Sequence, residues 1–151
     1  MNPWWMAIAF GLLIIFAMLR YVYYLGGEVL NERARESFFL QHTRLEHLLL
    51  AAGTARGLPR GLRWVECTFD DRVIFVWDKV AGAMAALVSA TVRFEAIPGS
   101  DMEGLPAVAM PRQGTAVLHF YRGDWHADAR LFFNMSPAGV IKEMAASLTP
   151  R

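Results

Sequence analysis

Residues 88–97 read Val-Ser-Ala-Thr-Val-Arg-Phe-Glu-Ala-Ile, a stretch in which apolar and polar side chains alternate. This alternation is typical of a strand with one buried and one hydrated face in an antiparallel sheet. The same period of two recurs over residues 62–78 and 115–133. Together with the helix signals described below, the stretch predicts an α+β fold with an antiparallel sheet of four to six strands.

The strands on the N-terminal side of this stretch are expected to form a hairpin. Residues 62–69 and 72–78 alternate on either side of Asp70-Asp71, and aspartates are common in turns. On the C-terminal side of the sheet, Ser136 is suited to cap a helix over residues 137–148. We therefore expect a C-terminal helix packed on the sheet.

A second hairpin, over residues 116–131, carries the candidate site. If Gly123-Asp124 form its turn, Tyr121 faces His126 and His119 faces Asp128. One face of the hairpin then holds five polar side chains: His119, Tyr121, His126, Asp128 and Arg130. A hydrogen bond from the imidazole of His119 to Asp128 would orient the ring for general base catalysis. The same alternation is also typical of any sheet with one face in water.

Residues 3–25 contain a single charged side chain, Arg20. A membrane-spanning helix needs about 20 apolar residues, and an arginine near its end can extend to the headgroups. Aromatic residues typical of membrane interfaces flank the segment at both ends: Trp4, Trp5, Tyr21, Tyr23 and Tyr24. These features predict a transmembrane anchor over residues 1–26, ended by Gly26-Gly27. A cleaved signal peptide and a buried hairpin of a soluble protein are the alternatives.

The flanking charges predict an orientation for this anchor. No basic residue precedes the segment, whereas four arginines lie at its end or follow it: Arg20, Arg33, Arg35 and Arg44. The positive-inside rule places the following domain in the cytoplasm. Because 13 of the 15 basic residues are arginine, which suggests a GC-rich bacterial genome, we expect a single-pass protein of a bacterial inner (plasma) membrane.

Residues 27–57 are expected to form an amphipathic connecting helix, ended by Gly53, and a hinge. A stripe with one polar member, Gln41, recurs near the 3.5-residue period at Leu30, Ala34, Phe38, Gln41, Leu45, Leu48 and Ala52. We expect this stripe to pack on the protein's own sheet, and an intermolecular coiled coil is the alternative. His42 and Glu46 share a helical face, as a solvated contact or, alternatively, as two metal ligands. Residues 58–151 then form the α+β globular domain.

The bulk composition excludes several classes of function. The formal net charge is +1, and beyond residue 26 the chain has 14 basic and 14 acidic residues, which argues against nucleic acid binding. Cys67 is the only cysteine, so no intrachain disulfide and no cysteine zinc site can form. We expect Cys67 to be a buried structural thiol. No sequence motif indicates a metal or a cofactor.

Two functions are compatible with these features. The first is a single-span membrane protein, attached to the bilayer through residues 3–25, whose domain mediates protein interaction, self-association or assembly of a membrane complex without catalysis. The second is a membrane-tethered domain that binds a small ligand or acts as an enzyme. In that case His119 and Asp128 are the catalytic candidates, and Tyr121, His126 and Arg130 bind the ligand.

Overall fold

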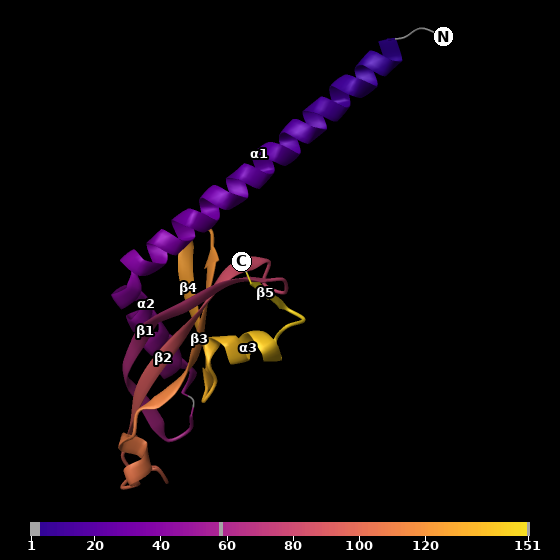
Figure 1. Ribbon diagram of the computed structural model, residues 1–151. Helices are drawn as coiled ribbons and strands as arrows, with labels where there is room; N and C mark the ends of the chain where they lie inside the picture. Colours follow the sequence, from indigo (N-terminus) through magenta and orange to yellow (C-terminus); the bar gives the residue numbers. More distant parts are fainter. Residues whose placement is uncertain (1–3, 58, 151) are drawn as a thin grey trace.

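A five-stranded antiparallel sheet with the strand order β4-β3-β2-β1-β5 lies at the centre of the molecule (Figure 1). The computed structural model describes residues 4–57 and 59–150, apart from the side chains of residues 5–7, 23–26 and 28. The elements follow in the order α1 (Trp4–Leu40), α2 (His42–Arg56), β1 (Leu62–Asp78), β2 (Ala83–Ala96), the short 3-10 helix η1 (Pro106–Ala109), β3 (Arg112–Tyr121), β4 (Asp124–Phe133), α3 (Pro137–Glu143) and β5 (Leu148–Pro150). This arrangement confirms the α+β fold and the antiparallel sheet.

α1 continues without a break through Gly26 and Gly27, so the predicted end of the first helix there is wrong. A glycine inside a helix costs about 1 kcal/mol relative to alanine, and the helix-forming residues that follow offset this cost. At 1.5 Å per residue the 37 residues of α1 extend over about 55 Å. The N-terminal half of α1 projects away from the sheet (Figure 1).

The predicted membrane anchor lies in this projecting half. No helix among the described residues is both long enough and apolar enough to cross a membrane, so the transmembrane helix stays a prediction. The large apolar side chains described between Ile8 and Val22 are 50 to 67% exposed. The side chains of Trp5, Tyr23 and Tyr24, which the sequence assigns to membrane interfaces, lie outside the described residues.

The connecting helix is divided in two. Its backbone departs from helical geometry at Gln41, between α1 and α2, and α2 ends at Gly57, which adopts a left-handed conformation with φ 62°. Gly53 is therefore not the terminating glycine. A Cβ atom at Gly53 would lie 2.5 Å from the ring of Trp64, so this glycine permits close packing of α2 on β1.

The helices cover both faces of the sheet. On one face, the end of α1 and α2 bury four residues of the predicted stripe or next to it: Ala34, Phe38, Leu45 and Leu49. This packing confirms that the stripe contacts the protein's own sheet. On the other face, Val140 of α3 and Leu148 of β5 pack against the buried valines and leucine Val76, Val117 and Leu87. α2 and α3 thus lie on opposite sides of the sheet (Figure 1).

β1 is one strand of 17 residues, so the hairpin predicted over residues 62–78 is wrong. Its pairing with β2 is irregular between Phe69 and Val73 and then continues to Asp78. The carboxylate of Glu46 in α2 accepts a hydrogen bond of 2.7 Å from the backbone N–H of Phe69. The helix thus satisfies a donor that the irregular ladder leaves free, and Asp70-Asp71 bend the strand without reversing it.

The C-terminal helix begins as predicted and ends earlier. The hydroxyl of Ser136 accepts a hydrogen bond of 3.2 Å from the backbone N–H of Gly139, and Pro137 is the first residue of α3. α3 ends at Glu143, and Leu148 opens the short edge strand β5, which pairs with the end of β1. The last turns of the predicted helix are thus replaced by a loop and a strand.

Candidate functional site

The hairpin of β3 and β4 turns at Arg122 and Gly123, one residue before the predicted turn. Both residues have positive φ angles, 55° and 85°, as a type I′ turn requires. Tyr121 therefore pairs with Asp124, and His119 pairs with His126 instead of Asp128. The predicted opposition of His119 and Asp128 is wrong.

A bulge in β4 restores the predicted register further along the hairpin. Leu118 pairs with Ala127, whereas Val117 pairs with Arg130, as the sequence predicts. Asp128 and Ala129 lie between these pairs, and Ala129 adopts a positive φ of 53°. A bulge redirects the side chains of its strand. Asp128 thereby approaches His119 although the two residues are not paired.

His119 contacts Asp78 from a strand that is not its neighbour. β2 lies between β1 and β3, so these two strands are about 10 Å apart. The β2 residues between the two side chains on this face are Ala83 and Ala85, paired with Asp78 and His119 respectively. Because these alanines are small, Asp78 and His119 meet above them with 3.0 Å between Oδ2 and Nε2. Both side chains are buried.

The hydrogen bonds of Asp78 define the proton position on His119. Burial raises the pKa of Asp78, but hydrogen bonds from Ala81 N–H, His119 and Val80 N–H, with the charge on His119, outweigh burial and hold the pKa below its ordinary value. An ionised carboxylate can only accept hydrogen bonds, so Nε2 of His119 donates. In the neutral imidazole, Nδ1 is then an acceptor available to other groups.

The Nδ1 side of His119 faces a more open region. Nδ1 lies 3.8 Å from Oδ2 of Asp128, whose side chain is half exposed. This distance is an ion-pair contact and is too long for a hydrogen bond. His119 therefore lies between two carboxylates, a buried one at Nε2 and a hydrated one near Nδ1.

A pocket of about 340 Å³ opens beside this pair. It is lined by the β1–β2 turn, β3, β4 and the loop after α3, through Asp78, Val80, Ala81, His119, Tyr121, Asp128, Arg130, Met144 and Ser147. Four of the five predicted site residues thus line one concave surface. The fifth, His126, lies outside the lining and stacks on Tyr121, with ring centroids 4.1 Å apart and planes at 5°. The guanidinium of Arg130 has no ion pair among the described residues.

Sequence reasoning missed Asp78, which is the most deeply buried acid of the site. Its Oδ1 accepts hydrogen bonds of 2.9 and 3.1 Å from the backbone N–H groups of Val80 and Ala81. An aspartate before a short run that contains glycine, as in Asp78-Lys-Val-Ala-Gly, is a signal for such a turn. That signal predicts the turn but gives no indication of the contact with His119.

The other polar candidates have structural roles. Asp124, predicted in the turn, forms a two-point ion pair with Arg44 of α2 at 3.1 and 3.0 Å, and the hydrogen bond to Arg44 is the main reason that the pKa of Asp124 is lowered. His42 and Glu46 are 3.7 Å apart, and Glu46 is engaged by β1. Over residues 4–57 and 59–150, no group of three His, Cys, Asp or Glu side chains is arranged to hold a metal ion.

Cys67 is buried, as the sequence predicts. Burial, with a smaller effect of the charge on Glu46, raises the pKa of its thiol to about 12. The thiolate is the reactive form of cysteine, so Cys67 is unsuited to nucleophilic chemistry near neutral pH.

Comparison with known proteins identifies no relative. No protein-family model matches the chain, and no curated protein or solved structure is significantly similar to it. Function must therefore be argued from the geometry alone.

Proposed function

We propose that this chain is a single-span bacterial membrane protein whose α+β domain acts as a non-catalytic partner in a membrane assembly. The observation that carries the proposal is the exposed apolar surface of the projecting half of α1. Eleven large apolar side chains between Ile8 and Val22 lie clear of the domain. Removing one such side chain from water contributes about 1.5–3 kcal/mol, so a bilayer around this segment would stabilise it strongly.

The distribution of arginines along α1 supports a cytoplasmic position of the domain in this proposal. Arg20 lies at the domain end of the apolar stretch, where its long side chain can reach the headgroups. Arg33 and Arg35 follow on the same helix, and no basic residue precedes the stretch. The positive-inside rule then favours the inner membrane with the domain in the cytoplasm.

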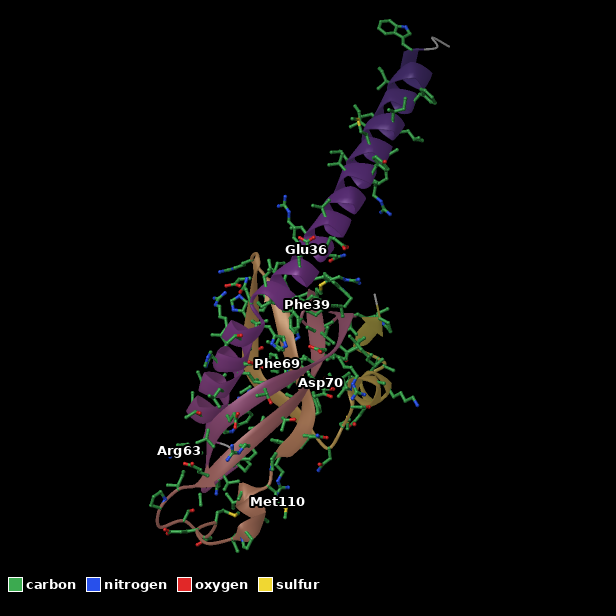
Figure 2. All side chains as sticks on the ribbon, turned by 60° about the vertical axis from the view of Figure 1, so that its left-hand side comes forward. Glu36, Phe39, Arg63, Phe69, Asp70 and Met110 are labelled. Atoms are coloured by element: carbon green, nitrogen blue, oxygen red, sulfur yellow. The ribbon has the colours of Figure 1, made fainter. Side chains whose placement is uncertain are left out.

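A second exposed apolar surface supports the proposal that the domain binds a protein partner. Phe39 and Leu40, at the junction of α1 and α2, are 55% and 87% exposed. Phe39 lies where the last turns of α1 reach the sheet (Figure 2). Contiguous exposed apolar surface often marks an interaction site, and Phe39 and Leu40 are adjacent in the chain. The junction is therefore the surface that we assign to the protein partner.

Two measurements test this function. In the first, the chain is synthesised in a cell-free system with liposomes and the vesicles are floated on a gradient. The chain should float with the vesicles and should resist extraction with carbonate. A photoreactive amino acid at Leu40 should give one discrete adduct in native membranes, whereas the same group at Arg60 should give none. Two differently tagged copies of the chain distinguish self-association from a second protein. A chain that stays at the bottom of the gradient, or equal labelling from both positions, would contradict the proposal.

A second candidate function, ligand binding, is favoured by the pocket beside His119. A concave surface with a buried, oriented imidazole is typical of ligand sites, and the arginine of this pocket, Arg130, has no ion pair among the described residues. Asp128 and Arg130 are exposed, so Asp128→Asn and Arg130→Met should leave the fold intact. Both variants should abolish a metabolite-induced rise in melting temperature, and the exposed Asp101→Asn should retain it. A broad screen without any shift would remove this candidate.

A further inference from the structure

A groove of about 720 Å³ lies between α1 and the hairpin turns of the sheet. Its lining comes from α1, the end of β1, the start of β2 and the β3–β4 turn, through Gly27, Leu30, Asn31, Trp77, Gly82, Ala83, Met84, Phe120, Tyr121, Arg122 and Gly123. In Figure 1 the β3–β4 end of the sheet lies beside the C-terminal half of α1. The groove is separate from the partner surface at Phe39 and Leu40, which does not line it.

The lining is suited to an amphiphile. Sites for small molecules have volumes of about 300–1,000 Å³ and are mainly apolar, with a few polar groups that fix the orientation. Leu30, Trp77, Met84 and Phe120 provide the apolar wall. Asn31 and Tyr121 add polar groups, and the charged residue of the lining is Arg122, which is exposed and forms no ion pair with any described residue. An acyl chain and an anionic group match this combination.

The β1–β2 turn lies at the same end of the sheet as Arg122 and contributes Gly82 to the groove. Met84 pairs with Phe120, so the β1–β2 turn lies beside the β3–β4 turn at the same end of the sheet. That neighbouring turn exposes Lys79 and Val80, and Val80 is 85% exposed. This end of the domain thus carries Lys79 and Arg122, and the acids that flank the two turns, Asp78 and Asp124, contact His119 and Arg44.

The distance between the groove and the apolar segment of α1 determines which layer of the bilayer the groove faces, and therefore which amphiphile can bind in it. Gly27 in the lining is two residues from Leu25, the last residue of the apolar segment in the sequence, which is about 3 Å along a helix. The headgroup layer on each side of a bilayer is about 5–8 Å thick, from the difference between the whole bilayer and its hydrocarbon core. If the apolar stretch lies in the bilayer, the groove opens into the headgroup layer.

We propose that this groove binds one anionic phospholipid of the bilayer that holds α1. The acyl chain lies against Leu30, Trp77 and Phe120, and the phosphate lies at Arg122. The proposal rests on the membrane attachment proposed above. It adds a specific lipid site, which orients the domain at the membrane surface.

The test uses the full chain in phosphatidylcholine nanodiscs, with Trp77 as the probe. Trp4→Phe and Trp5→Phe remove the tryptophans of the apolar segment, and the remaining Trp64 and Trp125 are buried. Dibrominated phosphatidylglycerol should quench the Trp77 emission at least two-fold more than dibrominated phosphatidylcholine at equal concentration. Trp77→Phe in the same background gives the signal that does not come from the groove.

Matched variants assign this effect to the groove. Arg122→Gln should bring the ratio of the two lipids to about one, and Arg122→Lys should restore it, because a lysine also binds phosphate as a point charge. Arg60→Gln, at the other end of the sheet, should leave the ratio unchanged. Leu30→Glu should abolish quenching by both lipids, whereas Leu40→Glu, outside the groove, should not.

Each other outcome overturns the proposal in an identifiable way. Equal quenching by both lipids in the chain with Arg122 unchanged would contradict a preference of the groove for an anionic headgroup. Absence of Trp77 quenching in a chain that floats with vesicles removes the lipid site and leaves the membrane attachment standing. If the quenching of Trp77 by the brominated lipids falls as the protein concentration rises, whichever lipid is present, the groove is occupied by a second copy of the chain. A chain that does not float removes both proposals.

Discussion

Asp78 holds three partners at once, the N–H groups of Val80 and Ala81 and the imidazole of His119. These partners favour its charged form, so its pKa lies below the ordinary value of 3.8 although burial opposes this. A group with a lowered pKa in the folded state stabilises the fold above its unfolded pKa. That stability is lost as the pH falls below about 4 and through the folded pKa.

Asp78→Asn should therefore reduce stability at pH 7 and make it less sensitive to acid. The variant keeps the shape but loses charge-assisted hydrogen bonds, which contribute about 1.5–3 kcal/mol. Near-UV circular dichroism in nonionic detergent would give melting temperatures from pH 7 to 3. The two proteins should differ most at pH 7 and converge toward pH 3. Parallel curves would show that the Asp78 charge does not stabilise the fold.

Trp125 connects the last strand to α1 through its indole nitrogen. Nε1 donates to the carbonyl of Ala34 at 3.0 Å and to the hydroxyl of Ser37 at 3.1 Å. Trp125→Phe should lower the free energy of unfolding by about 1 kcal/mol beyond its loss of buried area, because Ser37 also donates to Ala34 and keeps that carbonyl satisfied. Urea unfolding measures this, and Trp125→Phe combined with Ser37→Ala should cost more than the two single changes together.

At the scale of elements, the packing of α2 on β1 depends on Gly53. Gly53→Ala raises helix propensity by about 1 kcal/mol, but its Cβ would lie 2.5 Å from the buried ring of Trp64. Overpacking of this kind costs about 1–3 kcal/mol, so we expect a net loss of stability. Gly11→Ala is the matched control, because its Cβ meets nothing within 4 Å. Equal melting temperatures for Gly53→Ala and the unmodified chain would show that α2 is not closely packed here.

The regular elements were predictable because their signals are local. The alternation over residues 88–96 lies within β2, which ends one residue before Ile97, and the N-cap of α3 is formed by Ser136 as expected. The bend of β1 was not predictable, because Asp70-Asp71 resemble a turn while the stabilising contact comes from Glu46 on α2. Local pattern cannot indicate a donor satisfied from another element.

The site was predictable in composition and only in part in geometry. Alternation placed His119, Tyr121 and Arg130 on one face, and they line one pocket. The one-residue shift of the turn, with φ 55° at Arg122, and the bulge at Ala129 changed the pairs. Asp78 reaches His119 across β2, a contact that depends on the register of three strands. Such a contact follows from the assembled sheet and from no single segment.

At the scale of the molecule, the two ends of the domain differ. The β1–β2 and β3–β4 turns, the groove and the projecting half of α1 are together at one end. Arg63 and Met110 lie at the opposite end, near η1 (Figure 2). The exposed apolar surface of α1 and the exposed cations of the turns are therefore next to each other, as a domain held against a membrane requires. Because of this difference between the two ends of the domain, α1 has two parts, one that projects from the domain and one that packs in the core.

Two truncations test this division of α1. Among the side chains that the structure describes, those of the buried core begin at Ala34, so removal of residues 1–26 deletes none of them. Removal of residues 1–40 also deletes Phe38, whose ring packs at 5.6 Å from Phe75 and 5.3 Å from Trp125. Loss of a buried phenylalanine costs about 3–5 kcal/mol, a large part of the 5–15 kcal/mol that stabilises a typical domain.

The shorter truncation should therefore keep its near-UV circular dichroism and a cooperative melting transition while it no longer floats with vesicles. The longer truncation should lose the cooperative transition, because the indole of Trp125 is left without Ala34 and Ser37 as acceptors. If both truncations melt alike, the end of α1 contributes nothing to the core. If the shorter one still floats, the domain itself binds the bilayer, and the apolar stretch between Ile8 and Val22 is not its only attachment.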